Sequence, residues 1–105
     1  MKIEELTNQI KKYNPNADFD LVNKAYDFAF KAHFNQIRES GHEHITHLLG
    51  ASKILADLKM DEITIAACLL HDTLEDTNIN KDALKSEFGN EITELIEGST
   101  KISKM

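Results

Sequence analysis

At 105 residues, the chain is long enough for one domain that buries about two thirds of its unfolded surface. Its 41% apolar and 29% charged residues exclude a disordered chain. The net charge of −6, with Arg38 as the single arginine, argues against nucleic-acid binding, which requires clustered Lys and Arg.

The first third of the chain predicts two helices. Residues 3–13 are amphipathic, with Ile3, Leu6 and Ile10 on one stripe, and Pro15 cannot continue that helix. Asp18 is a good N-cap for the second helix. Apolar residues follow the helical period within it at Leu21, Ala25, Phe28, Ala29 and Ala32.

The middle of the chain predicts a loop and two further helices. Periodicity fails from residue 35 to residue 46, where polar residues surround Gly41, so this segment is expected to be a loop. A third helix is expected from residue 47 to residue 58, and Asp61 is expected to cap a fourth. The apolar positions expected to be buried in the third helix are Leu48, Ala51, Leu55 and Leu58.

The last third predicts a loop over residues 75–79 and two short helices. The first of these begins near Asn80 and ends at Phe88 and Gly89. Asn90 is expected to cap the second, and Gly98 to end it after Glu97. The expected fold is therefore all-α, with about five to six helices in a single unit spanning residues 1–105.

Two further features bear on the compartment of the protein. Cys68 is the single cysteine and lies in an apolar run, so it is expected to fill the core and cannot form an internal disulfide. No stretch approaches the ~18 apolar residues of a membrane span, and the start lacks a signal-peptide pattern. The expected location is the cytoplasm, with no membrane partner.

The most informative motif is His71-Asp72 at the end of the fourth helix. The pair offers one nitrogen and one oxygen ligand for a divalent cation, and His47 offers a second imidazole if helices three and four are antiparallel neighbours. Two imidazoles and a carboxylate suit Mn, Fe or Zn better than Mg or Ca. Glu75 and Asp76, each four residues after one of the pair, are placed to act as a general base. Together these groups predict metal-assisted hydrolysis of a phosphate ester.

Each of these residues also has an alternative explanation. Glu75 and Asp76 alone would be typical of a solvated loop. His42, His44 and His47 could form a rival zinc site, but no cysteine supports it, so incidental surface histidines explain them better. His33, beside Phe34, is typical of a histidine at the edge of a core.

The chain resembles the hydrolase domain of RelA/SpoT-type alarmone enzymes. Residues 32–41 resemble the loop that opens that domain, and residues 64–77 resemble the family's HD motif with its acidic continuation. Further matches are residues 12–15, 88–89 and 98–101. The resemblance implies a helical HD-superfamily fold and Mn²⁺-dependent removal of the 3′-pyrophosphate from guanosine tetra- or pentaphosphate, the alarmones of the stringent response.

The resemblance also implies roles for individual residues. His47, His71 and Asp72 fall on the metal ligands of the family. Glu75 and Asp76 fall on its catalytic acids. Arg38 falls on the residue that packs on the guanine base, and Ser40 lies in the same substrate-binding loop.

Some positions differ from the family pattern. Leu48 replaces the usual proline after the first metal histidine, Glu39 replaces a basic residue, and residues 40–44 depart from the usual Ser-Gly-Glu-Pro-Tyr. These differences affect the fit of the substrate more than that of the metal.

The family's fourth metal ligand is an aspartate on a later helix, so the chain resembles a partial hydrolase domain, truncated at its C-terminus, and is expected to be weakly active or inactive alone. The alternatives are a non-catalytic fragment that self-associates through exposed apolar surface, and an HD phosphohydrolase for another nucleotide.

Overall fold

The structure is a computed structural model that describes residues 3–34, 41–71, 73 and 79–103, with side chains described for residues 3–32, 47–71, 73 and 79–98. Every described element is a helix, which confirms the all-α prediction. The helices are α1 (Ile3–Tyr13), α2 (Phe19–Phe34), α3 (Gly41–Asp57), α4 (Glu62–Leu70), α6 (Lys81–Phe88) and α7 (Asn90–Ser103).

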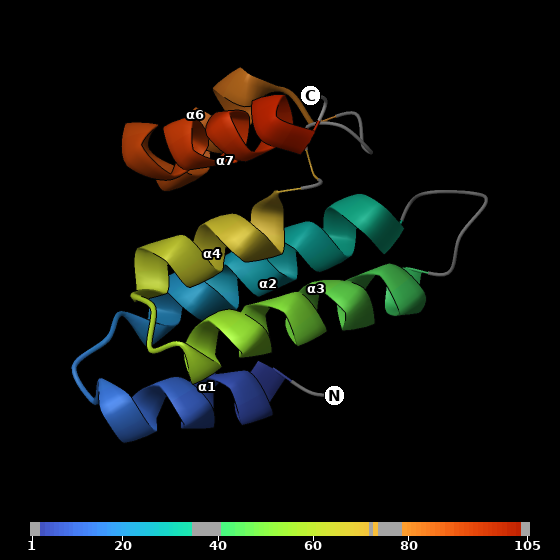
Figure 1. Ribbon diagram of the computed structural model, residues 1–105. Coiled ribbons are helices and arrows are strands. Elements are labelled where there is room, and N and C mark those ends of the chain that lie inside the picture. The colour runs from blue at the N-terminus through green and yellow to red at the C-terminus, as the bar shows by residue number, and fades with distance from the viewer. Residues whose placement is uncertain (1–2, 35–40, 72, 74–78, 104–105) are drawn as a thin grey trace.

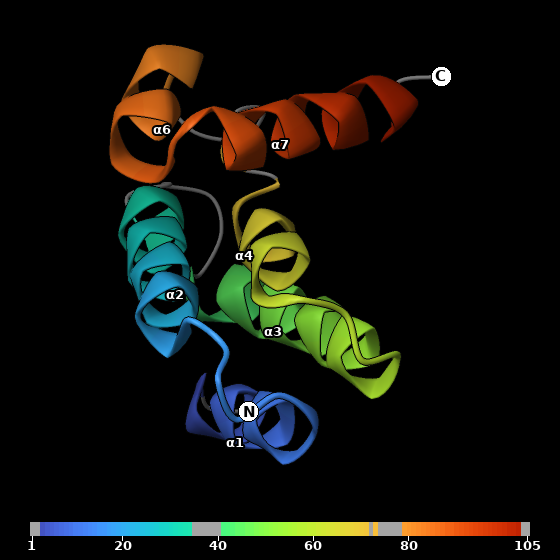
Figure 2. The same cartoon turned by 90° about the vertical axis from the view of Figure 1, so that its left-hand side faces the viewer.

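The helices lie in three tiers (Figure 1). The middle tier holds α2, α3 and α4, with α3 antiparallel to both of the others. Helix α1 packs beneath it against α3 and α2, while α7 lies above and packs against α4. Figure 2 shows α6 above α2, with α7 reaching across above α4.

Helix α4 lies at the centre of the core. Five of its nine residues are buried, among them Ile65 and Leu69, and its sequence is the most apolar of any described helix. Helices α2, α3 and α7 all pack against it, and α7 contributes the buried side chains of Ile92 and Ile96 to the same core. A residue that directly follows α4 is therefore held by a well-packed support.

Local hydrogen bonds explain where several helices begin. The Asp61 carboxylate accepts from the Thr64 amide at 3.2 Å at the start of α4, and the Asn80 side chain accepts from the Ala83 amide at 2.9 Å at the start of α6. The Asp18 carboxylate likewise accepts from the Leu21 amide at 3.1 Å. These three N-caps and the bounds of α1 confirm the sequence-based expectations.

The turn from α3 to α4 is a Schellman motif. The Met60 amide donates to the Leu55 carbonyl at 3.1 Å and the Lys59 amide to the Ala56 carbonyl at 2.9 Å. Lys59 occupies the left-handed position with φ of 60°, where glycine is usual. The turn reverses the chain within four residues and makes α3 and α4 a tight hairpin.

Five sequence-based expectations are wrong. Asn90 does not cap α7 but is its first residue, since the Gly89 carbonyl accepts from the Thr93 amide at 3.3 Å where the helix begins. Helix α3 begins at Gly41, so residues 41–46 are helical rather than a loop, and it ends at Asp57, which leaves Leu58 67% exposed in the turn. Helix α4 ends at Leu70, so His71 is its C-cap and not one of its helical residues. Helix α7 passes through Gly98 to Ser103, because one glycine inside a helix costs only about 1 kcal/mol.

Candidate metal centre

His71 is held in place by the last turn of α4. Its backbone amide and its ring Nδ1 both lie on the Cys68 carbonyl oxygen, at 3.3 Å and 2.6 Å. A carbonyl oxygen only accepts, so in the neutral ring Nδ1 carries the proton and Nε2 carries the lone pair. A backbone carbonyl on one ring nitrogen is the usual support of a metal-binding histidine, because it fixes the tautomer and orients the ring.

His47 lies on α3 at the same level as His71. His47 lies ten positions before Asp57, the last residue of α3. His71 lies nine positions after Glu62, the first residue of α4. With a rise of about 1.5 Å per residue, both histidines lie roughly 14–15 Å from the turn that joins the two helices. The two helices are antiparallel neighbours, as the sequence predicted, and each of them therefore carries its histidine toward the open end of the hairpin. His47 is exposed, and His71 is half-buried.

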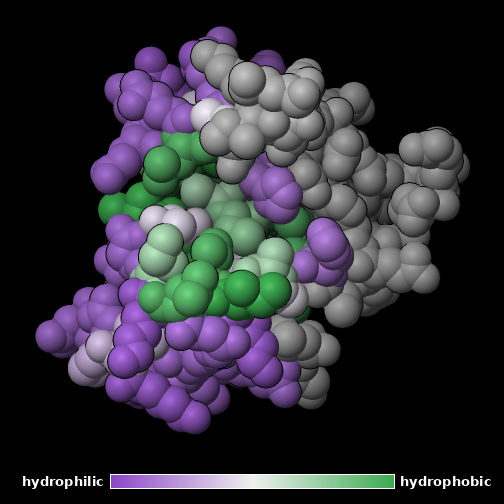
Figure 3. Space-filling model, viewed as in Figure 1, coloured by the Kyte–Doolittle hydropathy of each residue, from purple (hydrophilic) through white to green (hydrophobic). Residues whose placement is uncertain are grey.

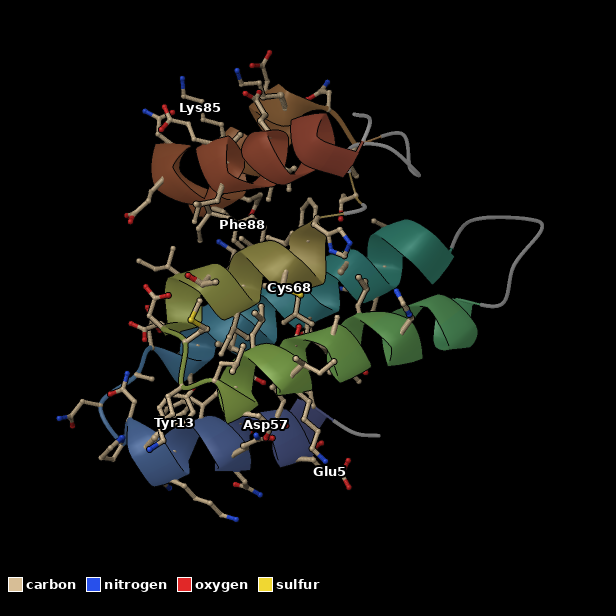
Figure 4. The ribbon with its side chains drawn as sticks, in the orientation of Figure 1. Glu5, Tyr13, Asp57, Cys68, Lys85 and Phe88 are labelled. Carbon is tan, nitrogen blue, oxygen red and sulfur yellow. The ribbon has the colours of Figure 1, made fainter. Side chains whose placement is uncertain are left out.

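An apolar groove runs from this open end along the hairpin. It has a volume of about 520 Å³ and is lined by Ala51, Ile54, Leu55, Thr64, Ala67, Cys68, His71 and Leu95. His71 is the last groove residue along α4. His47 is on the stripe of α3 that carries Ala51 and Ile54, four and seven residues further on. In Figure 3 the apolar surface gathers in this region of the face, and Figure 4 places Cys68 on the side of α4 that faces α3.

Sequence reasoning missed this groove. It treated Leu58 as a core residue and Cys68 as filler, whereas Leu58 is exposed and half-buried Cys68 lines the groove. Exposed apolar side chains at Ile54 (62%) and Leu95 (45%) flank it on α3 and α7. The available signal was the spacing of residues 47, 51, 54 and 58, which forms a second stripe on α3 beside the buried one.

The other expected site residues lie outside the described part of the chain: Arg38, Ser40, Asp72, Glu75 and Asp76. The same holds for the rival zinc site of His42, His44 and His47, because the side chains of His42 and His44 are not described. The side chain of His33 also lies outside the described part of the chain. Within the described residues, no group of three or more His, Cys, Asp or Glu side chains could hold a metal ion. What the structure does place is one histidine near the open end of each helix of the hairpin, His47 on α3 and His71 after α4.

Comparison with known proteins gives this arrangement a family context. The family model described as HD domain matches residues 25–105, which include most of α2, all of α3 to α7, and both His47 and His71. The chain belongs to the HD-domain family. Its relatives place it with the HD region of RelA/SpoT-type proteins, which confirms the resemblance seen in the sequence.

Several relatives match nearly the whole chain. A GTP pyrophosphokinase of Brucella ovis is 42% identical over 105 residues, which are all of this chain and 14% of the relative. A probable GTP pyrophosphokinase of Mycobacterium leprae is 42% identical over 98% of this chain and 13% of its own length. A guanosine-3′,5′-bis(diphosphate) 3′-pyrophosphohydrolase of Aquifex aeolicus is 41% identical over 97% of this chain and 14% of its own length. The chain thus spans about a seventh of the length of these relatives.

The membrane expectation was tested on the described helices as well. Among the residues that the structure describes, no helix is both long enough and apolar enough to cross a membrane.

Proposed function

We propose that this chain forms the metal-binding part of a phosphohydrolase that removes the 3′-pyrophosphate of guanosine tetra- or pentaphosphate. The observation that carries the proposal is the His71 ring, whose Nδ1 lies 2.6 Å from the Cys68 carbonyl, so that Nε2 carries the lone pair. Membership of the HD-domain family supports it, as does the relative named a guanosine-3′,5′-bis(diphosphate) 3′-pyrophosphohydrolase.

The donor set fits a divalent transition metal, for which we propose Mn²⁺. Imidazole nitrogen is a good ligand for Mn, Fe or Zn and a poor one for Mg or Ca. We propose that His47 and His71, with Asp72, hold the ion at the open end of the hairpin. A divalent ion supplies Lewis-acid stabilisation of charge on the phosphoryl oxygens when it is bound.

The remaining roles in this proposal belong to residues of the two connecting segments. Glu75 and Asp76 act as the general base and orient the attacking water. Arg38 stacks its planar guanidinium on the guanine base, and Ser40 contacts the nucleotide beside it. The products are GDP or GTP and pyrophosphate.

Calorimetric titration with Mn²⁺ tests the metal site. We expect single-site binding by the unaltered chain, lost in both His71→Ala and His47→Ala. His42→Ala serves as the matched control, because only the rival site of His42, His44 and His47 requires that residue. Binding that survives His71→Ala would contradict the proposal, and binding that is lost in His42→Ala would favour the rival site.

The substrate is tested separately. Guanosine and adenosine 3′-pyrophosphates are offered in competition, with GDP or ADP release followed by chromatography and Asp72→Asn as the inactive control. Preference for the guanosine compound supports the alarmone assignment, and preference for the adenosine compound would favour an HD phosphohydrolase for another nucleotide.

A non-catalytic role is the second candidate, favoured by one observation. Ile54, Leu58 and Leu95 are 62%, 67% and 45% exposed, and two of them line the groove. Apolar side chains that gather in this way are typical of an association surface. Sedimentation of the unaltered chain and of Ile54→Lys tests self-association, and a concentration-independent monomer would remove this candidate.

A further inference from the structure

Lys24 of α2 contacts the C-terminal end of α6 in three ways. Its Nζ donates to the backbone carbonyl of Glu87 at 2.7 Å and lies 3.4 Å from the Glu87 carboxylate. The same ammonium stands over the ring of Phe88, 5.1 Å from its centroid. Phe88 in turn packs edge-to-face on Phe28 of α2, with ring centroids 5.3 Å apart. We refer to Lys24, Phe28, Glu87 and Phe88 as the α2–α6 latch.

The strength of the latch depends on the ammonium charge. The ion pair with Glu87 contributes little, since both side chains are half-exposed. The hydrogen bond to the Glu87 carbonyl is charge-assisted and lies at the negative end of the α6 dipole. The contact with the Phe88 ring adds a cation–π attraction. A neutral side chain of the same length would lose both larger contributions and keep only the aliphatic packing.

The latch is connected to the histidine end of the hairpin through α7. Phe88 is the last residue of α6, and only Gly89, with φ of 88°, separates it from α7. Helix α7 packs on α4 through Ile92 and Ile96, and its Leu95 lines the groove that ends at His71. Figure 2 shows α6 above α2, with α7 reaching from there across α4. Figure 4 places Phe88 between the upper helices, α6 and α7, and the middle tier of α2, α3 and α4.

We infer that Lys24 is a positioning residue: it fixes α6 on α2 and thereby sets the position of the α7 wall beside His71. Lys24 contacts neither histidine, so its effect on the candidate site passes through α6 and α7. The effect on metal binding rests on the proposed function, whereas the effect on α6, α7 and the His71 ring does not.

The test compares Lys24→Met, Lys24→Arg and the unaltered chain in the absence of metal. We expect Lys24→Met to raise amide hydrogen exchange in α6 and α7 by about tenfold, with no change in α1. The imidazole ¹H and ¹⁵N signals of His71 are expected to shift in the same variant. Lys24→Arg, which keeps the charge, is expected to restore both readouts.

Two further variants make the test specific. Lys31→Met is the matched control, because Lys31 also lies on α2 and lines the cleft beside Glu87, and it is expected to behave like the unaltered chain. Glu87→Gln removes the ion pair but keeps the carbonyl, so it is expected to change exchange by less than about twofold.

Four outcomes would overturn the inference. They are unchanged exchange in Lys24→Met, exchange raised equally in all helices, His71 signals that do not move, and a failure of Lys24→Arg to restore them. Mn²⁺ titration of the same variants is read separately. If the unaltered chain binds no Mn²⁺, the proposed function fails, but the exchange and His71 readouts still decide the role of Lys24.

Discussion

The two ends of the α3–α4 hairpin differ in how they are held. At the closed end, the Schellman turn, the Asp61 cap and the Tyr13 hydroxyl, which donates to the Met60 carbonyl at 2.7 Å, fix the backbone. Gln9 of α1 also donates to the Asp57 carboxylate (Figure 4). At the open end, the Cys68 carbonyl accepts from the His71 backbone amide and orients the His71 imidazole.

We infer from this difference that the two ends of the α3–α4 hairpin have different roles. Packing and local hydrogen bonds at the closed end set the register of α3 against α4, and that register determines whether His47 and His71 lie level. In the proposed function, the open end carries the metal ligands His47 and His71. Changes at the open end should therefore affect binding, and changes at the closed end should affect stability.

The largest expected effect is on the open end. His71→Ala should weaken Mn²⁺ binding by about 100-fold or more, since a lost ligand costs at least as much as a lost supporting group. The free energy of unfolding in metal-free buffer should change little, because His71 is half-buried and lies beyond the end of α4. Calorimetry and urea unfolding measure the two quantities. A large loss of stability without metal would show that the two ends are not separable.

Asp61→Ala should have the largest effect on stability at the closed end. It removes the carboxylate that accepts from the Thr64 amide and should lower the free energy of unfolding by about 1 kcal/mol, within a range of about 0.5–2 kcal/mol. Asp61→Asn, which can still cap, is the control and should retain most of the stability. A difference of less than about 0.3 kcal/mol between the two variants, measured by urea unfolding, would contradict this role.

Tyr13→Phe should have a smaller effect that depends on pH. Burial, followed by the carboxylates of Asp61 and Glu62, raises the pKa of the Tyr13 hydroxyl above its ordinary value of 10.0. A raised pKa means that the stabilisation is fully present below pH 10 and is lost as the pH rises through the pKa of the folded state. The variant should therefore lose roughly 0.5–1 kcal/mol at neutral pH, where the hydrogen bond to Met60 is intact.

Urea unfolding above pH 10 separates the contribution of Tyr13 to stability from that of other groups. The difference between Tyr13→Phe and the unaltered chain should shrink above pH 10, as urea unfolding across that range would show. Tyr26, whose pKa burial also raises, provides the control. Tyr26→Phe retains Tyr13, so its free energy of unfolding should still fall above pH 10 by the amount that Tyr13 contributes. A constant difference for Tyr13→Phe at all pH values would exclude this linkage.

Both ends of the hairpin were predictable only in part: at the closed end the Asp61 cap was predicted correctly, whereas the end of α3 and the exposure of Leu58 were not. Asp61 caps α4 through a hydrogen bond to a residue three positions away, so the pattern is local and can be read directly. The antiparallel pairing of α3 and α4 was predicted from the short connection between them. The Cys68 carbonyl beneath His71 and the groove beside it depend on side-chain direction and on α7, which residue spacing alone does not specify.

Two of the wrong predictions concern helix ends without a specific cap, the start of α3 and the end of α7. Apolar periodicity reports which face of a segment is buried, so it missed the polar first turns of α3 at Gly41–Thr46, which are helical all the same. Gly98 signals a stop only when the chain leaves the helix there. Helix α7 continues instead, with Ile92 and Ile96 buried on α4 in the turns before it.

The smallest effect is expected from Lys59→Gly, which should stabilise the closed end. Lys59 has φ of 60°, a conformation that costs an L-residue about 1–2 kcal/mol relative to glycine. The greater entropy of glycine in the unfolded chain offsets about 0.4–1 kcal/mol of that gain. The net increase in the free energy of unfolding should be about 0.5 kcal/mol. Lys59→Ala is the control: it removes the same side chain but keeps the strain, so it should not stabilise, and equal stabilisation by both variants would trace the effect to the lysine side chain instead.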